Sequence, residues 1–325
     1  MTTARTILAV DGGNSKTDLA LVAEDGTVLA TGRTGPFLPQ SAGVAAAADV
    51  VERAARALRD GMAAPYADVL AAYLAGADFP AEEEALRAEF LARGCAGEVA
   101  VANDTFAVLR AGASRSWGVI VVCGAGMNAA GVSPSGEVAR FPALGRRSGD
   151  WGGGEELAEW VLWHAARTED GRGPATALAE LVVTTFGTAS VADVVLALHS
   201  GELDPARLHE LVPGLFTVAA GGDAVARGLV ARQAEEVAVM ARVCLERLGL
   251  LDTPTEVVLG GSVLTARDPY LHGMIEAALG ASAPDARVVV SSLPPVAGAA
   301  LAGLDLLGAA EAARTRVRDH FRRSR

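Results

Sequence analysis

A glycine-rich turn near the N-terminus is the first stretch whose residue types could do chemistry. Residues 7–10 are apolar and predict a buried strand, and apolar residues resume at 19–22, so the chain makes a hairpin between them. Glycine lets a backbone approach a ligand closely, and hydroxyl and amine side chains can bind phosphate oxygens. We therefore expect a phosphate-binding turn formed by Gly12, Gly13, Asn14, Ser15, Lys16 and Thr17. Asp11, at the end of the first strand, can hold a hydrated metal ion.

The composition of the chain supports this interpretation of the turn. Lysine and arginine together number 28, yet Lys16 is the only lysine. The chain has three asparagines, Asn14, Asn103 and Asn128, and each lies shortly after an apolar run. An ordinary hairpin with a solvent-facing lysine is the alternative, but this unusual placement favours a phosphate site.

A carboxylate follows another short apolar stretch in the first third of the chain. Residues 98–102 predict a strand that runs directly into Asn103, Asp104 and a helix through residue 109. A carboxylate at the end of a strand could take a proton from an attacking hydroxyl group. The alternative is that Asp104 only caps the helix that follows it.

Two more glycine turns follow predicted strands later in the sequence. The strand at 117–123 leads into a turn whose backbone amides could bind a second face of a phosphate chain: Gly124, Gly126, Met127 and Asn128. The strand at 255–259 ends in Gly260, Gly261 and Ser262, where glycine would let a flat ring lie against the backbone. Alone, this last motif could equally be a tight connection between a strand and a helix.

The order of the predicted elements indicates two α/β domains. Strands alternate with helices over residues 1–115, with 31–36 expected to be a loop, and a second strand–glycine turn–strand unit opens the domain over 116–308. We expect the final helix, about 309–325, to pack back on the first domain. A duplicated architecture of this kind places a ligand-binding cleft between its halves.

The bulk composition limits the possible partners and location. The 325 residues carry a formal net charge of −11, which argues against nucleic acid or an anionic membrane as the main partner. No signal peptide or membrane-spanning segment is predicted. Cys95, Cys123 and Cys244 match no metal or disulfide spacing, which is typical of a cytoplasmic protein.

Taken in order, the motifs resemble those of one superfamily. They are DGGNSKTD at 11–18, VANDTFAVLRAG at 101–112, VVCGAGMNAAGV at 121–132, SGDWGGG at 148–154, LGGSVL at 259–264 and PPVAGA at 294–299. This set resembles the sugar kinase/actin-like ATPase superfamily, which has a ribonuclease H-like core in each of two domains. Within it, the chain is most similar to the N-acetylglucosamine kinases and their BadF/BadG/BcrA/BcrD ATPase relatives.

The resemblance implies phosphorylation of a sugar hydroxyl by ATP, at the 6-hydroxyl of a hexose or amino sugar such as N-acetylglucosamine. Asp104 would be the general base, Asp150 would bind sugar hydroxyls, and Asp11 would hold Mg²⁺ through water. The turns at 12–17 and 124–128 would bind the ATP phosphates, and 260–262 the adenosine. A homodimer is the expected assembly.

At three positions this sequence differs from the residues that are usual in the family it resembles. Leu38 stands where a sugar-binding asparagine is usual, with Gln40 as the nearest amide; Met127 replaces a small hydroxyl residue, and Trp151 an acidic one. Two alternatives remain open. One is an ATPase that activates a partner enzyme and shares an iron–sulfur cluster between subunits, and the other is a non-catalytic sugar or nucleotide sensor.

Overall fold

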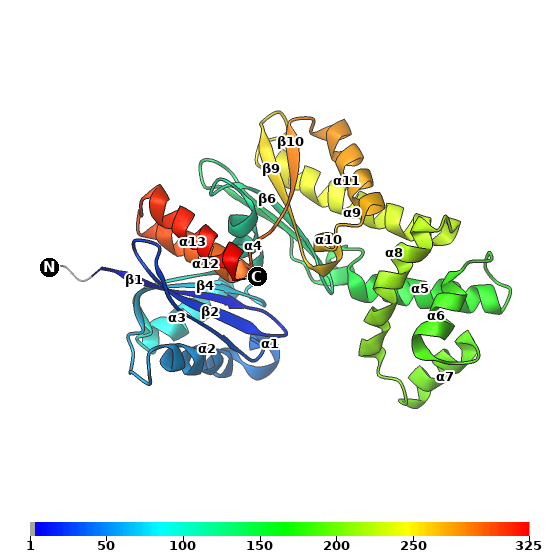
Figure 1. The fold of residues 1–325 in the computed structure, drawn as a ribbon, viewed down its shortest axis with the longest axis horizontal. Helices are drawn as coiled ribbons and strands as arrows, with labels where there is room; N and C mark the ends of the chain where they lie inside the picture. The colour runs from blue at the N-terminus through cyan, green and yellow to red at the C-terminus, as the bar shows by residue number, and fades with distance from the viewer. Residues whose placement is uncertain (1–3, 325) are drawn as a thin grey trace.

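The computed structural model describes residues 4–324 and contains two five-stranded mixed sheets (Figure 1). The first sheet has the order β3-β2-β1-β4-β5, in which β1 to β3 are antiparallel and β4 and β5 run parallel to β1. Its strands are β1 (Thr6–Gly12), β2 (Thr17–Ala23), β3 (Val28–Thr34), β4 (Ala67–Leu74) and β5 (Ala96–Asn103). The expected α/β fold, with two actin-like units that each open on a hairpin, is confirmed.

Helices cover both faces of the first sheet because its central strands are apolar on both sides. On one face, Leu8 and Val10 of β1 pack against α2 (Val44–Leu58), and α3 (Pro80–Ala92) covers the same face beside α2. The short α1 (Pro39–Ala42) directly precedes α2. On the other face, Ile7 and Ala9 pack against α12 (Pro295–Leu306). The alternation of side-chain direction along a strand produces this division.

The second sheet repeats the strand order of the first. Its order is β10-β9-β6-β7-β8, with a β6–β7 hairpin and parallel β9 and β10. The strands are β6 (Gly118–Cys123), β7 (Met127–Val132), β8 (Val138–Arg140), β9 (Thr255–Gly260) and β10 (Ala286–Val290). The accompanying helices are α5 (Gly154–Glu169), α6 (Leu178–Phe186), α7 (Val191–Ser200), α8 (Val212–Ala220), α9 (Ala224–Arg247), α10 (Ser262–Thr265) and α11 (Pro269–Ser282). In Figure 1, α5 to α8 extend away from the first sheet.

The helix that begins at Asp104 lies between the two sheets. One side of α4 (Asp104–Gly112) belongs to the same apolar cluster as α12, through Ala107 and Ala111. Its other side packs on the second sheet, where Leu109 contacts the cluster of Ile120 and Val258. Because α4 contacts both sheets, a movement of one unit relative to the other would change the packing around this helix.

The C-terminal helices pack on the first sheet. The cluster that joins α12 to β1 also contains Val317 and Phe321 of α13 (Glu311–Arg323), and Arg316 binds the Asp25 carboxylate at 2.6 Å. The sequence placed α12 in the second unit, whose expected limit was residue 308. We propose that the first unit takes in α12 as well; residues 1–3 and 325 of its expected range lie outside the described residues.

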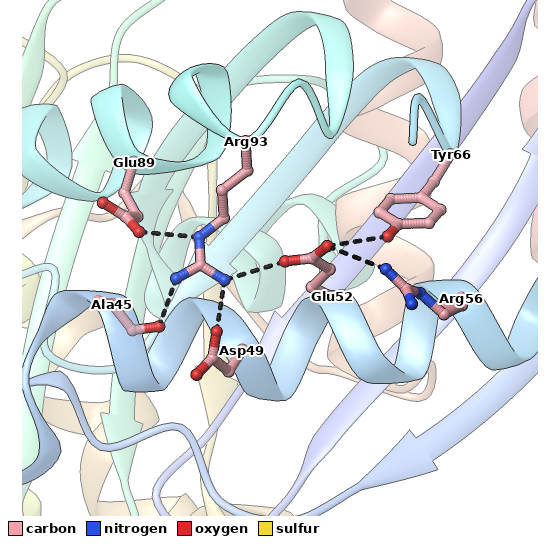
Figure 2. Close-up of polar contacts among 7 residues, drawn as sticks. All are labelled: Ala45, Asp49, Glu52, Arg56, Tyr66, Glu89 and Arg93. Carbon is pink, nitrogen blue, oxygen red and sulfur yellow. Dashed lines mark hydrogen bonds and ion pairs between the residues drawn. The ribbon is translucent and has the colours of Figure 1, made fainter. Parts of the chain in front are cut away.

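Two helices of the first unit are joined by one arginine (Figure 2). Arg93, just after α3, binds Asp49 at 2.6 Å and Glu52 at 3.0 Å on α2, and Glu89 at 2.8 Å on α3. It also donates to the Ala45 carbonyl at 2.8 Å. These contacts fix the helix layer that supports β1 and β4.

One local expectation was wrong. Residues 31–34 were expected in a loop, but β3 continues through Thr34 because it pairs with β2 as an edge strand. The residues of β3 alternate between half-buried and exposed and include Gly32, so the strand has no continuous apolar run that would predict it.

Across the described residues, no individual helix has both the length and the apolar character needed to cross a membrane. Two bent helix pairs meet those criteria jointly, by length and composition alone.

Candidate active site

The first glycine turn and Asp104 lie at the same edge of the first sheet. The register places Gly12 on β1 level with Leu74 on β4, and Leu74 level with Asn103 on β5. Adjacent strands are about 4.8 Å apart, so the ends of β1 and β5 are separated by about 10 Å. The carboxyl ends of three parallel strands therefore bring Asp11 and Asp104 to the same edge of the sheet.

The first turn is tightly built. A Cβ at Gly12 would lie 2.7 Å from the Leu74 side chain and 3.2 Å from Phe37, so only glycine fits without a shift. The Gly13 amide donates to the Lys16 carbonyl at 2.9 Å and closes the turn. The exposed side chains of Asn14 and Ser15 lie at its tip.

Two of the predicted phosphate ligands have protein partners here. The Lys16 ammonium lies 3.1 Å from the Asp18 carboxylate, which Arg33 also binds, and the buried Thr17 hydroxyl donates to the Gly35 carbonyl at 2.9 Å. Lys16 remains about half exposed and can turn toward a ligand. Phosphate binding by these residues stays a prediction.

Asp104 does not cap its own helix. The cap is Asn103, whose side-chain oxygen accepts from the Thr105 amide at 3.1 Å and from its hydroxyl at 2.6 Å. The Asp104 carboxylate, in the first turn of α4, accepts no side-chain hydrogen bond from the described residues. Burial, with the Asp78 charge as a second cause, raises the pKa of Asp104 to about 6 against the opposing effect of nearby backbone amides. An acid with this pKa is ionised at neutral pH and can accept a proton.

Asp11 also lies in an environment that disfavours its negative charge. Burial raises the pKa of Asp11 to about 7, and the charges of Asp104 and Asp18 act in the same direction more strongly than Lys16 and Arg33 act against it. A bound cation would relieve this repulsion, so the donor set suits a divalent ion.

Three glycine segments meet at the carboxyl edge of the second sheet. The Gly154 amide donates to the Gly124 carbonyl at 2.8 Å, and the Glu155 amide donates to Ala125 at 3.0 Å. A Cβ at Gly153 would lie 2.5 Å from the Ala125 oxygen, and one at Gly261 would overlap the Cys123 carbonyl. These contacts require glycine and bring the start of α5 and the end of β9 against the second turn.

A cavity of about 720 Å³ opens beside these glycines. The predicted members Gly124 and Ser262 line it, together with Gly154 from the start of α5. The remaining wall is mostly apolar and comes from α5, α8, the 3₁₀ helix Pro205–Leu211 and the end of α10: Glu155, Glu159, Leu208, His209, Val212, Phe216 and Ala266 are among its residues. Sequence reasoning missed this wall because nothing in residues 205–216 marks them as ligand-binding.

Met127 and Asn128 point in different directions. The Met127 side chain is buried in the core, where its sulfur accepts from Gln233, so only the backbone of Met127 is available to a phosphate, and that contact stays a prediction. Asn128 lines a small pocket of about 10 Å³ between the units, which Asn103 and Asp78 also line. The second hairpin therefore approaches the strand end that carries Asp104.

The residues expected to bind the sugar, Gln40 and Asp150, lie in different units and are each held by local contacts. The Gln40 amide donates to the Gly76 carbonyl at 2.9 Å, which holds it near the end of β4. Asp150 accepts from the Ser148 hydroxyl at 2.6 Å in the loop before α5, and among the described residues it has no contact with Asp104. Trp151 is buried beneath the Arg232 guanidinium, and Leu38 is exposed. Their roles in sugar binding stay predictions.

The three cysteines do not form a common site. All are buried and free, and they lie in β6, in α9 and just before β5. In the part of the chain that the structure describes, no group of three histidine, cysteine, aspartate or glutamate side chains could hold a metal. An Asp11 site would therefore complete its coordination with water and ligand oxygens.

Together, two actin-like units with a glycine-lined cavity and a carboxylate at their seam define the class as an actin-like ATPase fold. The model of the BadF/BadG/BcrA/BcrD ATPase family matches residues 8–303, and the chain belongs to this family. This confirms the membership expected from the motifs.

Named relatives agree with this placement. An N-acetyl-D-glucosamine kinase from Dictyostelium discoideum is 24% identical over 212 residues, which are 62% of this chain and 64% of that protein, just under two thirds of its length. A structure from Chromobacterium violaceum, assigned provisionally as an N-acetylglucosamine kinase, is 22% identical with a TM-score of 0.71, covering 93% of this chain and 99% of its own. A ROK family glucokinase from Streptomyces griseus, solved with glucose and AMPPNP, is 17% identical with a TM-score of 0.57 over 93% and 98%. The two structures are similar to this chain in fold.

Proposed function

We propose that this protein is an ATP-dependent sugar kinase that phosphorylates a hexose or amino-sugar hydroxyl. The observation that carries the proposal is the position of Asp104, an acid with a pKa of about 6 at the start of the helix wedged between both sheets. Phosphoryl transfer depends mainly on positioning and charge stabilisation, which a carboxylate at the seam of two ligand-binding units provides.

The proposed chemistry assigns one step to each part of the site. The cavity beside Gly124 and Ser262 would hold the adenosine of ATP, and the turns at 12–17 and 124–126 would bind its phosphates. Asp104 would accept the proton of the sugar hydroxyl while the oxygen of that hydroxyl forms a bond to the γ-phosphorus. The bond from that phosphorus to the bridging oxygen breaks, and ADP leaves with the electron pair.

Asp11 fits the role of magnesium ligand. Its carboxylate lies at the same sheet edge as Asp104, where burial and, second, the charge of Asp104 raise its pKa to about 7. When bound, the ion supplies neutralisation of the phosphate charge.

The acceptor we propose is N-acetylglucosamine or a close relative, with the phosphoryl group transferred to its 6-hydroxyl. The named activity of the Dictyostelium relative supports this choice. The test is an ADP-release screen with glucose, glucosamine, N-acetylglucosamine, N-acetylmannosamine and N-acetylmuramic acid. Turnover with one amino sugar well above the rest is the expected result, and no stimulation by any sugar would overturn the proposal.

No arrangement of the described cysteines favours a cluster-bearing activator of a partner enzyme. The homodimer and the cytoplasmic location stay predictions from the sequence.

A further inference from the structure

One ion pair joins the two units directly beside the proposed base. Arg140, at the end of β8 in the second sheet, binds Glu83 of α3 with nitrogen–oxygen distances of 3.0 and 3.5 Å. Glu83 is mostly buried, with 17% of its side chain exposed, and Arg140 is 30% exposed. A bidentate, partly buried pair of this kind is stronger than an ordinary surface pair.

The same glutamate holds the residue before Asp104. The Asn103 amide donates to a Glu83 oxygen at 3.3 Å, and that oxygen is also bound by Arg140. The Asn103 side chain caps α4 and donates to Asp78 at 2.8 Å. A single carboxylate therefore connects β8 of the second unit to the junction of β5 and α4.

Arg140 is held from its own side as well. Its guanidinium lies 5.6 Å from the centre of the Phe106 ring on α4, and its carbonyl accepts from Arg247 of α9 at 3.2 Å. It is also the cation that lowers the pKa of Asp78, which burial and Glu82 raise. Removing Arg140 would leave several carboxylates near Asn103 without compensation.

The surroundings leave this contact free to open. A cavity of about 350 Å³ lies between β5, α4, α12 and β7–β8, and Glu83, Phe106 and Arg140 line it. The two units are not closely packed at this point, so the ion pair spans a gap. A polar contact across a gap can break and reform when the units move.

We propose that Glu83 and Arg140 form an interdomain latch that positions Asp104 only when the two units are closed. The catalytic part of this inference rests on the proposed function, and the structural part does not. Both residues are positioning residues, because they act on Asp104 through Asn103.

The kinetic test compares Arg140→Gln, Glu83→Gln and the double variant with Arg287→Gln. Arg287 is an exposed arginine of β10 whose side chain makes no hydrogen bond or ion pair with the described residues, so it is a matched control. Each latch variant should lower kcat about tenfold or more and leave the KM for ATP within about twofold, because neither Glu83 nor Arg140 lines the cavity proposed for ATP. The kcat of the double variant should be no lower than that of the less active single variant. Arg140→Lys, which keeps the charge, should retain more kcat than Arg140→Gln. Unchanged kcat, or fully additive losses, would overturn the latch.

A second measurement is independent of catalysis. Spin labels at Ala63→Cys and Ala277→Cys, both exposed and in different units, can be attached selectively because the native cysteines are buried. The interdomain distance distribution should broaden in Arg140→Gln and stay unchanged in Arg287→Gln. An identical distribution in both variants would refute the latch even if the kinase is active. If the parent protein shows no sugar-dependent turnover, the proposed function fails and this distance measurement alone decides the latch.

Discussion

Gly261 packs so closely on the backbone of Cys123 that a side-chain carbon at position 261 would overlap the Cys123 carbonyl. Gly261 also has a φ of +83°, a conformation that residues with side chains adopt only with strain. The contact joins the end of β9 to the end of β6 next to Gly124 and Ser262, which line the cavity proposed for ATP. The third glycine motif of the sequence is therefore a structural requirement of that cavity.

We expect Gly261→Ala to destabilise the protein by about 2 kcal/mol or more, from the strained φ and the backbone overlap together. Urea unfolding measures the change in the free energy of unfolding, and isothermal titration calorimetry should show weaker ATP binding. Gly280→Ala is the control, because a Cβ at Gly280 meets nothing within 4 Å on α11 and should stabilise that helix by up to about 1 kcal/mol. Equal stability of Gly261→Ala and the parent protein would contradict the assigned packing.

Asp104→Asn should lower kcat by about 10²- to 10⁴-fold while ATP binding is retained, because the amide cannot accept the hydroxyl proton. The parent enzyme should lose kcat/KM as the pH falls through about 6, where Asp104 becomes protonated. Undiminished turnover of the variant would show that another group is the base.

The same substitution should stabilise the fold at neutral pH. The pKa of Asp104 is raised from 3.8 to about 6, so the folded protein holds its proton more tightly than the unfolded chain does, and stability falls as the pH rises between these values. Asp104→Asn removes this penalty and should gain about 1–3 kcal/mol at pH 7.5, since one pKa unit corresponds to about 1.36 kcal/mol. At pH 3 the difference should vanish. A variant less stable than its parent at pH 7.5 would argue against the buried charge.

Magnesium binding at Asp11 can be measured without turnover. At pH 8, above its pKa of about 7, the Asp11 carboxylate is ionised near the negative charges of Asp104 and Asp18. A bound magnesium ion would stabilise this state, so MgCl₂ should raise the melting temperature of the parent protein more than NaCl of equal ionic strength. Asp11→Asn should lose this difference. The same magnesium response in both proteins would place the ion elsewhere.

The ATP cavity can be filled from its rim. Ala266 is exposed and lines the cavity, so Ala266→Trp should raise the KM for ATP about tenfold and leave the melting temperature nearly unchanged. Ala277→Trp, on an exposed position of α11, is the control for adding an indole. An unaltered KM in Ala266→Trp would exclude this cavity as the nucleotide site.

The Arg93 contacts of Figure 2 should contribute to stability. Arg93 is 19% exposed, and its carboxylate partners hold the pKa of the guanidinium above its usual value. Arg93→Ala leaves Asp49 and Glu89 without their cation and Glu52 with Arg56 alone, and should cost about 2–3 kcal/mol. Arg53→Ala, an exposed arginine on α2, should change stability by less than about 0.5 kcal/mol. Equal losses in the two variants would show that the contacts of Arg93 add nothing specific.

Local chemistry at strand ends is what the sequence by itself determined. Strands that run parallel in one sheet end at a common edge, so the polar residues that directly follow such strands lie there together. Once β1, β4 and β5 are known to run parallel in one sheet, the order of residues is enough to place Asp11 and Asp104 at the same edge. The same argument places the turn at 124–126 at the edge of the second sheet. The N-cap of α9 is equally local, since the Asp223 side chain accepts from the Ala226 amide three residues later.

Only the tertiary structure decided the contacts between distant segments. The assignment of α12 to the first sheet depends on close approach, since a Cβ at Gly298 would overlap the Ala107 backbone of α4. The apolar wall of the cavity proposed for ATP and the Glu83–Arg140 pair likewise join residues far apart in the chain. Such pairings leave no periodic pattern in one sequence, because they depend on how completed elements pack and not on the order of neighbouring residues.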